Sequence, residues 1–299
     1  MNNSERIRKV TIMIYKPEKQ PTLYLSDLDG TLLRSNERIS EYAANTIDLL
    51  VKNGGFFSYA TARSLTTASK VTERLTVRLP VICYNGAFIF ENLTNKTLYE
   101  HFFTSSEVKY VRNTLCAHNI YPIVYSFIDG AEQLSYIERY ATIEMKRFFD
   151  SRTGDPRLRK VKNIKELYSG DVFYFDAMDT PEALANINEI FKDDKRFNCL
   201  YQKDIYSGDQ WWELLPAEST KANAALSLKD MLGCSRLVVF GDGINDLSMF
   251  SVADECYAVS NAVPELKAIA TAVIDSNDND GVAKWLEAEA INSNYDAMH

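Results

Sequence analysis

Short apolar runs alternate with segments of helical periodicity near both ends of the chain. Near the amino terminus, the apolar runs predict strands over Leu23–Ser26, Phe56–Ala60 and Val81–Tyr84. Between them, apolar residues recur at helical spacing and predict helices over Ser40–Asn53 and near Leu65–Leu75. This order of strands and helices favours a parallel sheet with right-handed crossovers.

The same alternation returns near the carboxyl terminus. A helix is expected over Ser219–Leu232, capped by Ser219 and ended by Gly233. The next elements expected are strands at Leu237–Phe240, Cys256–Val259 and Ala272–Ile274 and a helix near Gly281–Ala290. The two ends of the chain therefore predict one α/β unit.

The middle of the chain lacks this regular alternation. Its expected elements are a hairpin of Phe88–Phe90 and Thr97–Phe103, a helix at Glu107–His118, a strand at Tyr121–Phe127, a charged irregular stretch to Gly170, a strand at Val172–Ala177, a helix from Thr180, and strands at Phe197–Tyr201 and Trp211–Leu215. Such a mixture predicts an α+β insert. We therefore expect a core of residues 1–87 and 216–299 and an insert of residues 88–215.

The composition is that of an ordinary globular protein and narrows the possible partners. The 299 residues are 46% hydrophobic and 25% charged, with a net charge of −8. An acidic chain is a poor candidate for binding nucleic acid or an anionic membrane. A phosphate-bearing small molecule remains compatible, because a few local cations decide its binding. The five cysteines lack a C-x-x-C pair and favour reduced thiols.

No apolar run approaches the roughly 18 residues that a membrane-spanning helix needs. The short apolar stretch Val10–Tyr15 is followed by Lys16-Pro17-Glu18 instead of a small-residue cleavage site, and we interpret it as a strand or an ordered extension. We expect a cytoplasmic protein without a membrane partner, either a monomer or a small homo-oligomer.

The strongest chemical signal follows the first predicted strand, in the pentapeptide Asp27-Leu28-Asp29-Gly30-Thr31. Residues i and i+2 of a strand point the same way, so both carboxylates can face one reaction centre. Like charges at short distance require a cation or a shared proton. The pattern indicates a metal ion, an acid/base pair with divided roles, or both, although Asp and Gly are also common in plain turns.

Three further segments carry candidate chemistry. Thr61 and Ala62 follow the second strand and precede a helix, which is a favourable position for binding phosphate. Lys221 stands in the first turn of a helix, where a cation opposes the helix dipole. The hexapeptide Gly241-Asp242-Gly243-Ile244-Asn245-Asp246 follows a buried strand and offers carboxylates of the kind that Mg²⁺ prefers.

Taken together and in this order, the four segments resemble the motifs of the haloacid dehalogenase superfamily of aspartate-nucleophile phosphotransferases. The insert, the segment Tyr84-Asn85-Gly86-Ala87 and the segment Asp280-Gly281-Val282-Ala283 are similar to the Cof-like branch. The resemblance covers roughly residues 20–290 and implies a Rossmann-like parallel-sheet core with an α+β cap of type IIB. Ala62 and Ala222 depart from the branch, in which glycine is usual at both positions.

The resemblance also implies roles for individual residues. Asp27 would be the nucleophile and Asp29 the general acid and base, while Asp27, the backbone carbonyl of Asp29 and Asp242 would hold Mg²⁺. The residues expected to bind the phosphate or the substrate are Thr61, Ala62, Asn85, Lys221 and Asn245. Asn245 and Asp246 would in addition orient Lys221 and waters on the metal.

The expected function is therefore a magnesium-dependent phosphatase for a small phosphorylated metabolite, such as a sugar phosphate. Two alternatives stay open: a phosphomannomutase-like phosphotransferase with the same nucleophile, and a binding protein with a vestigial site. The intact set of Asp27, Asp29, Lys221 and Asp242 argues against the second alternative.

Overall fold

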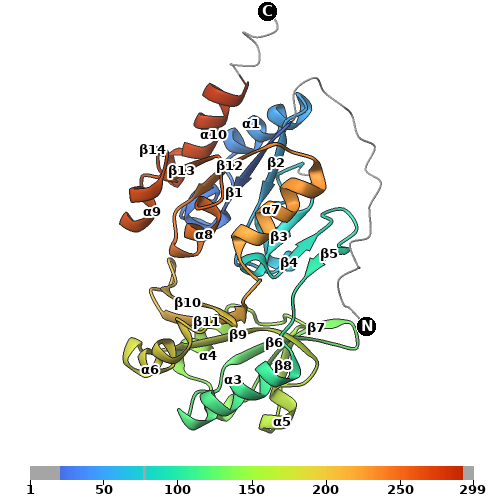
Figure 1. Ribbon diagram of the computed structural model, residues 1–299, viewed down its shortest axis with the longest axis vertical. Helices are drawn as coiled ribbons and strands as arrows, with labels where there is room; N and C mark the ends of the chain where they lie inside the picture. The colour runs from blue at the N-terminus through green and yellow to red at the C-terminus, as the bar shows by residue number, and fades with distance from the viewer. Residues whose placement is uncertain (1–20, 77–78, 292–299) are drawn as a thin grey trace, which may run out of the picture.

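The computed structural model describes residues 21–76 and 79–291. The strand or ordered extension expected over Val10–Tyr15 lies outside these residues. Two main sheets, each with its own helices, lie one above the other in the long direction of the molecule (Figure 1). Within the described ranges, no helix has the length and apolar character needed to cross a membrane.

The first sheet is parallel and has five strands in the order β14-β13-β12-β1-β2. Its strands are β1 (Thr22–Ser26), β2 (Phe56–Tyr59), β12 (Arg236–Gly241), β13 (Glu255–Val259) and β14 (Ala272–Ile274). This confirms the α/β class. The order places β1 between β2 and β12, so that segments far apart in the sequence end at one edge of the sheet.

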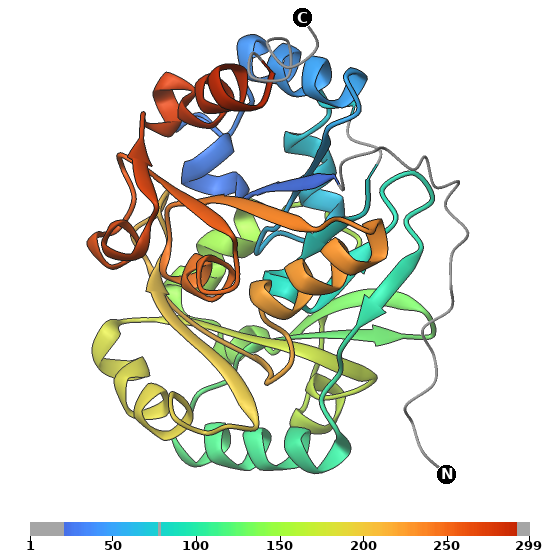
Figure 2. The ribbon, with the colours of Figure 1, turned by 45° about the horizontal axis from the view of Figure 1, so that its top comes forward.

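Helices cover both faces of this sheet. They are α1 (Glu41–Lys52), α2 (Leu65–Val71), α7 (Lys221–Leu232), α8 (Leu247–Phe250), α9 (Pro264–Ile269) and α10 (Gly281–Trp285), the last continued by a π-helical turn over Leu286–Ile291. Figure 2 shows α1 and α10 on one face and α7 and α8 on the other. Helix α1 begins where Ser40 accepts a hydrogen bond from the amide of Ala43, as predicted.

The third expected strand does not extend the parallel sheet, which corrects the sequence-based topology. Strand β3 (Val81–Cys83) forms an antiparallel sheet with β4 (Phe88–Phe90) and β5 (Thr97–Glu100). One isolated bridge, from Ala60 to Ile82, connects it to the end of β2. The turn Tyr84–Gly86, in which all three residues have positive φ, reverses the chain and pairs β3 with β4.

The second main sheet has six strands in the order β10-β11-β9-β6-β7-β8. Its strands are β6 (Ile123–Ile128), β7 (Ala131–Tyr136), β8 (Leu158–Lys160), β9 (Asp171–Asp179), β10 (Phe197–Lys203) and β11 (Gln210–Pro216), and its helices are α3 (Ser105–Ala117), α4 (Ile143–Asp150), α5 (Ile164–Leu167) and α6 (Pro181–Phe191). The sheet lies almost entirely inside the insert expected at residues 88–215; those limits remain a proposal.

The stretch between Phe127 and Gly170 is not irregular, contrary to the sequence-based expectation. It contains β7, α4, β8 and α5. Strands β6 and β7 are joined by the two-residue turn Asp129-Gly130, in which both residues have positive φ. Strand β7 was missed because only Leu134 and Ser135 are buried in it, so it lacks a regular apolar alternation.

The two faces of the second sheet meet different partners. Phe175, Trp212 and Leu214 pack with residues of α3 and α6 in a separate apolar cluster. Tyr174 and Leu215, which point the other way, belong to the main apolar cluster around the parallel sheet. The second sheet therefore has one face covered by α3, α5 and α6 and an inner face whose residues join the main cluster together with Met145 and Phe148 of α4.

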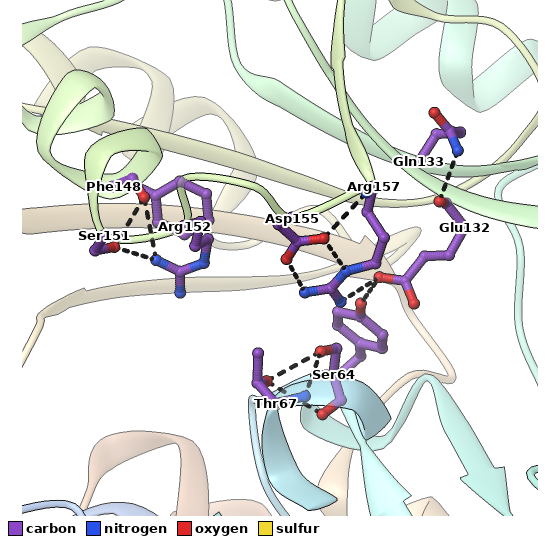
Figure 3. A network of polar contacts seen from close by, with 10 residues as sticks. Ser64, Thr67, Glu132, Gln133, Phe148, Ser151, Arg152, Asp155 and Arg157 are labelled. Carbon is purple, nitrogen blue, oxygen red and sulfur yellow. Dashed lines mark hydrogen bonds and ion pairs between the residues drawn. The ribbon is translucent and has the colours of Figure 1, made fainter. Parts of the chain in front are cut away.

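Polar contacts also connect the insert to the core. Tyr84 donates a hydrogen bond to Glu132, which also pairs with Arg157 at 2.8 Å; Arg157 pairs in turn with Asp155 at 2.6 Å. Figure 3 shows this group above Ser64, at the beginning of α2. The turn after β3 is thus held by the insert.

The same turn also fixes the beginning of α7. The helix is capped by Thr220, which accepts a hydrogen bond from the amide of Asn223, and Ser219 is buried one residue earlier. The expected cap at Ser219 is therefore wrong by one position. Gly86 has a φ of 97°, and a Cβ there would lie 2.2 Å from the carbonyl oxygen of Thr220. Only glycine fits between these two segments.

We expect Gly86→Ala to lower the free energy of unfolding more than Gly54→Ala does. Both glycines have positive φ (97° and 84°), so the backbone strain of the two variants is similar. Only Gly86 has neighbours in the way, because nothing lies within 4 Å of a Cβ at Gly54. Overpacking should make the difference about 1–3 kcal/mol in urea denaturation. Equal losses would show that the contact with Thr220 does not constrain α7.

Candidate functional site

The candidate site lies at the carboxyl edge of the parallel sheet, where the loops after β1 and β12 meet. The amide of Asp27 donates to the carbonyl of Phe240 at 2.9 Å, which ties the first loop to the end of β12. Thr31 donates to Asp242 at 2.8 Å and joins the two loops again. Parallel strands bring these segments together, as the sequence predicted.

Three buried carboxylates gather at this edge. One oxygen from each of Asp27, Asp242 and Asp246 lies within 4.8 Å of the others. Lys221 reaches them from the first turn of α7, with its ammonium 2.6 Å from Asp27 and 2.7 Å from Asp246. The lysine is 1% exposed, so both ion pairs are shielded from water.

Burial and mutual repulsion change the acidity of these groups. Burial raises the pKa of Asp27 well above its usual range; Lys221 acts against this shift, while Asp246 and Asp242 add to it. Burial, followed by the charge of Asp246, raises the pKa of Asp242 to about 7. Burial alone would lower the pKa of Lys221, but Asp246 and Asp27 outweigh it and raise that pKa, so the ammonium stays charged.

The donor set fits a hard divalent cation. Three carboxylates against one ammonium leave two negative charges when all are ionised. Oxygen ligands of this kind suit Mg²⁺, and a divalent ion would neutralise the excess. The carboxylates are also held in place, because the amides of Asp242 and Gly243 donate to Asp246 at 2.9 and 3.0 Å.

The glycines of the two motifs let these groups approach. A Cβ on Gly30, whose φ is 74°, would lie 2.4 Å from Oδ2 of Asp242. A Cβ on Gly241 would lie 2.7 Å from Oδ2 of Asp246. Each glycine of the pair therefore makes room for a carboxylate of the site.

Asp29 is not one of the three gathered carboxylates and has partners of its own. Arg63 donates to both of its oxygens, at 2.7 and 2.5 Å, and also pairs with Glu37 at 2.8 Å. Tyr206, on the loop between β10 and β11, donates to the same carboxylate at 2.8 Å. Burial and the nearby charge of Asp29 raise the pKa of Tyr206, so its hydroxyl keeps its proton. The insert thus contacts Asp29 directly.

The remaining predicted residues lie around Thr61. Its hydroxyl accepts from the amide of Arg63 at 3.1 Å, across Ala62, and its carbonyl accepts from the amide of Asn85 at 3.0 Å. The side chain of Asn85 accepts from Asn245 at 3.0 Å. Asp246 contacts Lys221, as expected of a residue that orients it, whereas Asn245 contacts Asn85.

Sequence reasoning missed three side chains of this region. Arg63 and Tyr206 hold Asp29, and Thr31 holds Asp242. Arg63 stands two residues after Thr61, in a segment already singled out, so its position was a usable signal. Tyr206 gave none, because its partner is 177 positions away in the sequence.

The sequence of the chain is similar to those of known proteins over most of its length. Two similar proteins of Bacillus subtilis are named 5-amino-6-(5-phospho-D-ribitylamino)uracil phosphatases: YitU is 24% identical over 90% of this chain and 98% of its own. YwtE is 27% identical over 87% of this chain and 95% of its own.

Solved structures agree in fold. A haloacid dehalogenase-like hydrolase from B. subtilis has a TM-score of 0.73 at 21% identity and covers 89% of this chain and 99% of its own. One from Bacteroides thetaiotaomicron has a TM-score of 0.71 at 21% identity, over 90% and 99%. These structures confirm the predicted α/β core.

The family of the chain is assigned by a match to a family sequence model and not by similarity to a single protein. The sequence model of the haloacid dehalogenase-like hydrolases matches residues 24–286, a range that includes the loops after β1 and β12, the beginning of α7 and the whole second sheet. The resemblance inferred from the motifs is thereby confirmed, and the chain belongs to the haloacid dehalogenase-like hydrolase family.

Proposed function

We propose that this hydrolase is a magnesium-dependent phosphatase that cleaves a small phosphorylated metabolite, a sugar phosphate or a similar monoester, through an aspartyl-phosphate. The observation that supports this most is the buried group in which Lys221 lies between Asp27 and Asp246, with Asp242 beside them. The two B. subtilis relatives named as phosphatases of a small organic phosphate support the same reaction.

In the first step, a carboxylate oxygen of Asp27 attacks phosphorus and the bond from phosphorus to the ester oxygen breaks. Asp29 gives a proton to the departing oxygen, which leaves as an alcohol. In the second step, Asp29 takes a proton from water, the water oxygen bonds to phosphorus, and the bond from Asp27 to phosphorus breaks. Phosphate is released, Asp27 is again an ionised carboxylate, and Asp29 is again protonated as it was before the first step.

The surrounding residues neutralise and position the phosphoryl group. Lys221 offsets the charge around Asp27, and the hydroxyl of Thr61 and the backbone around Ala62 donate to phosphoryl oxygens. Asp27, Asp242 and the backbone carbonyl of Asp29 would hold Mg²⁺, which would supply positive charge that offsets the charge of the transferring group. Asp246 supports the site through Lys221 and the backbone of the second loop.

The insert, proposed as residues 88–215, acts as a cap that selects the substrate. The inner face of its sheet packs against the core, and Tyr206, on the loop between β10 and β11, donates to Asp29. Both oxygens of Asp29 accept hydrogen bonds here, from Arg63 and Tyr206. We infer that substrate binding displaces Tyr206 from Asp29, which couples the cap to proton transfer.

We expect Asp27→Asn to lower turnover of p-nitrophenyl phosphate by at least about 10³-fold, because an amide is not a nucleophile toward phosphorus. The thermal unfolding midpoint should stay near that of the wild type, since the amide keeps the shape of the side chain. Asp193→Asn, at an exposed position, is the matched control and should retain full activity. A variant at position 27 that keeps a few per cent of the rate would exclude Asp27 as the nucleophile.

The raised pKa of Asp242 predicts opposite effects of pH on the metal-free and metal-bound protein. The folded state binds a proton at about pH 7, but the unfolded chain only near 3.8. The metal-free protein should therefore lose stability as pH rises from about 4 to 7, by on the order of 1 kcal/mol per pH unit, and level off above 7. Mg²⁺ needs the ionised carboxylates, so it should stabilise far more at pH 7.5 than at pH 5.

Thermal denaturation with EDTA or with Mg²⁺ at these pH values measures both effects. Asp242→Asn should reduce the slope of stability against pH in the metal-free protein. It should also remove most of the stabilisation by Mg²⁺. Stabilisation by Mg²⁺ that is equal at pH 5 and pH 7.5 would contradict the assignment of Asp242 as a ligand.

Oxygen-18 water distinguishes hydrolysis from mutase chemistry. We expect each released phosphate to contain one solvent oxygen, because water attacks phosphorus in the second step. Mass spectrometry of the phosphate released over several turnovers measures the incorporation of solvent oxygen. An isomerised sugar phosphate without free phosphate would replace the phosphatase assignment by a mutase.

A further inference from the structure

The inner face of the insert's sheet carries a group of polar side chains between the apolar ones. Asp176 on β9 lies directly opposite Glu213 on β11, and Tyr174 on β9 lies directly opposite Tyr125 on β6. Gln202 on β10 donates to Glu213 at 3.2 Å. We call these five residues the inner polar cluster; they point toward the core because Phe175 and Trp212 face the helices.

Stability alone does not explain why Asp176 and Glu213 lie directly opposite each other in the sheet. Two carboxylates in directly opposed positions repel each other, and Asp176 and Glu213 are 1% and 3% exposed. The hydrogen bonds of Glu213 come from Tyr174 and Gln202, which are neutral. Among the described residues, neither carboxylate forms an ion pair.

Two polar atoms on this face have no hydrogen-bond partner within the described residues. Oδ2 of Asp176 accepts from Tyr125 at 3.3 Å, but Oδ1 is buried without a donor. Nε1 of Trp211, which is on the same strand face as Glu213, is buried without an acceptor. An acceptor and a donor that are both unpaired inside a fold call for an explanation, and a ligand that satisfies both is one.

A chain of hydrogen bonds joins the cluster to the catalytic loop. Asn245, the neighbour of Asp246, donates to Asn85 at 3.0 Å, and Asn85 donates to Tyr174 at 3.1 Å. Tyr174 donates to Glu213. Glu213 is also close enough to Lys221 for the ammonium to lower its pKa, although burial dominates and raises it. These contacts connect the cluster to the loop that contains Asp246 and to the surroundings of Lys221.

We propose that the inner polar cluster, centred on Asp176 and Glu213, binds the leaving group of the substrate, and that this leaving group is neutral and rich in hydroxyl groups, as in a polyol or sugar phosphate. The inference rests on the proposed phosphatase function and adds its recognition site. Hydroxyl groups both donate and accept, which matches the mixture of carboxylate, phenol, amide and indole groups on this face.

The unpaired donor on this face favours a neutral ligand over a cationic one. An ammonium group has no acceptor and would leave the indole N–H of Trp211 unpaired, whereas a hydroxyl group can accept from it. Burial also raises the pKa of Glu213 to about 7, and burial together with Glu213 raises the pKa of Asp176.

The first test uses the wild-type protein with Mg²⁺ and four phosphate esters: sorbitol 6-phosphate, propyl phosphate, phosphoethanolamine and p-nitrophenyl phosphate. We expect kcat/KM for the polyol phosphate to exceed that for propyl phosphate by at least about 10²-fold, because buried polar groups would stay unpaired beside the propyl chain. No hydrolysis of any ester would refute the proposed function itself. Hydrolysis without preference for the polyol, or a preference for the amine, would refute only the inference.

The second test compares Asp176→Asn with Asp171→Asn, an exposed carboxylate on the same strand. Asp176→Asn should lower kcat/KM for the polyol phosphate about tenfold to hundredfold and lower that for p-nitrophenyl phosphate by a clearly smaller factor, because its leaving group has no hydroxyl groups for Asp176 to bind. Asp171→Asn should change neither. The exchange removes a buried charge, so the unfolding midpoint should not fall. Equal losses on both esters in a folded variant would show that Asp176 is structural.

Glu213→Gln provides a second variant. It keeps an acceptor for Tyr174 but loses the carboxylate, and we expect the same selective loss on the polyol phosphate. Unchanged selectivity in both variants would overturn the proposal.

Discussion

The ammonium of Lys221, buried between Asp27 and Asp246, is the interaction on which the rest of the site depends. Among the described residues it is the one cation that pairs with any of the three gathered carboxylates, and it pairs with Asp27 and Asp246. Removing it would leave like charges in a medium that solvates them poorly, which costs several kcal/mol. Its position also requires the beginning of α7 to lie against the ends of β1 and β12. Sheet order, helix position and local glycines all follow from keeping these few atoms together.

The insert also contributes contacts to the catalytic site. One face of its sheet packs against α3, α5 and α6, and the other belongs to the apolar cluster around the parallel sheet. Through Tyr206 it touches Asp29, and through Tyr174 and Asn85 it touches the loop that contains Asp246. The two units therefore share polar groups at the place where chemistry is expected, and a change in one alters the surroundings of the other.

The sequence predicted the parts of this arrangement that are local. Asp27, Asp29, Asp242 and their glycines form short motifs at strand ends, where the carboxyl edge of a parallel sheet collects them. Of the missed features, the contact of Tyr206 with Asp29 depends on a partner 177 positions away, whereas the third strand pairs with β4 through the adjacent turn at Tyr84–Gly86. The cap of α7 was placed one residue early because Ser219 and Thr220 are both good caps; the contact of Thr220 with Gly86 decides between them.

The order of strands has a consequence for how the protein acquires its activity during synthesis. Lys221 lies 194 positions after Asp27, and Asp242 lies 211 positions after Thr31. The strands of the second sheet, by contrast, all lie between Ile123 and Pro216 and can pair before β12 leaves the ribosome. Closing the long connection between β1 and β12 is entropically easier once the intervening chain is compact. The insert is thus in a position to serve as the folding spacer that brings the two halves of the catalytic edge together.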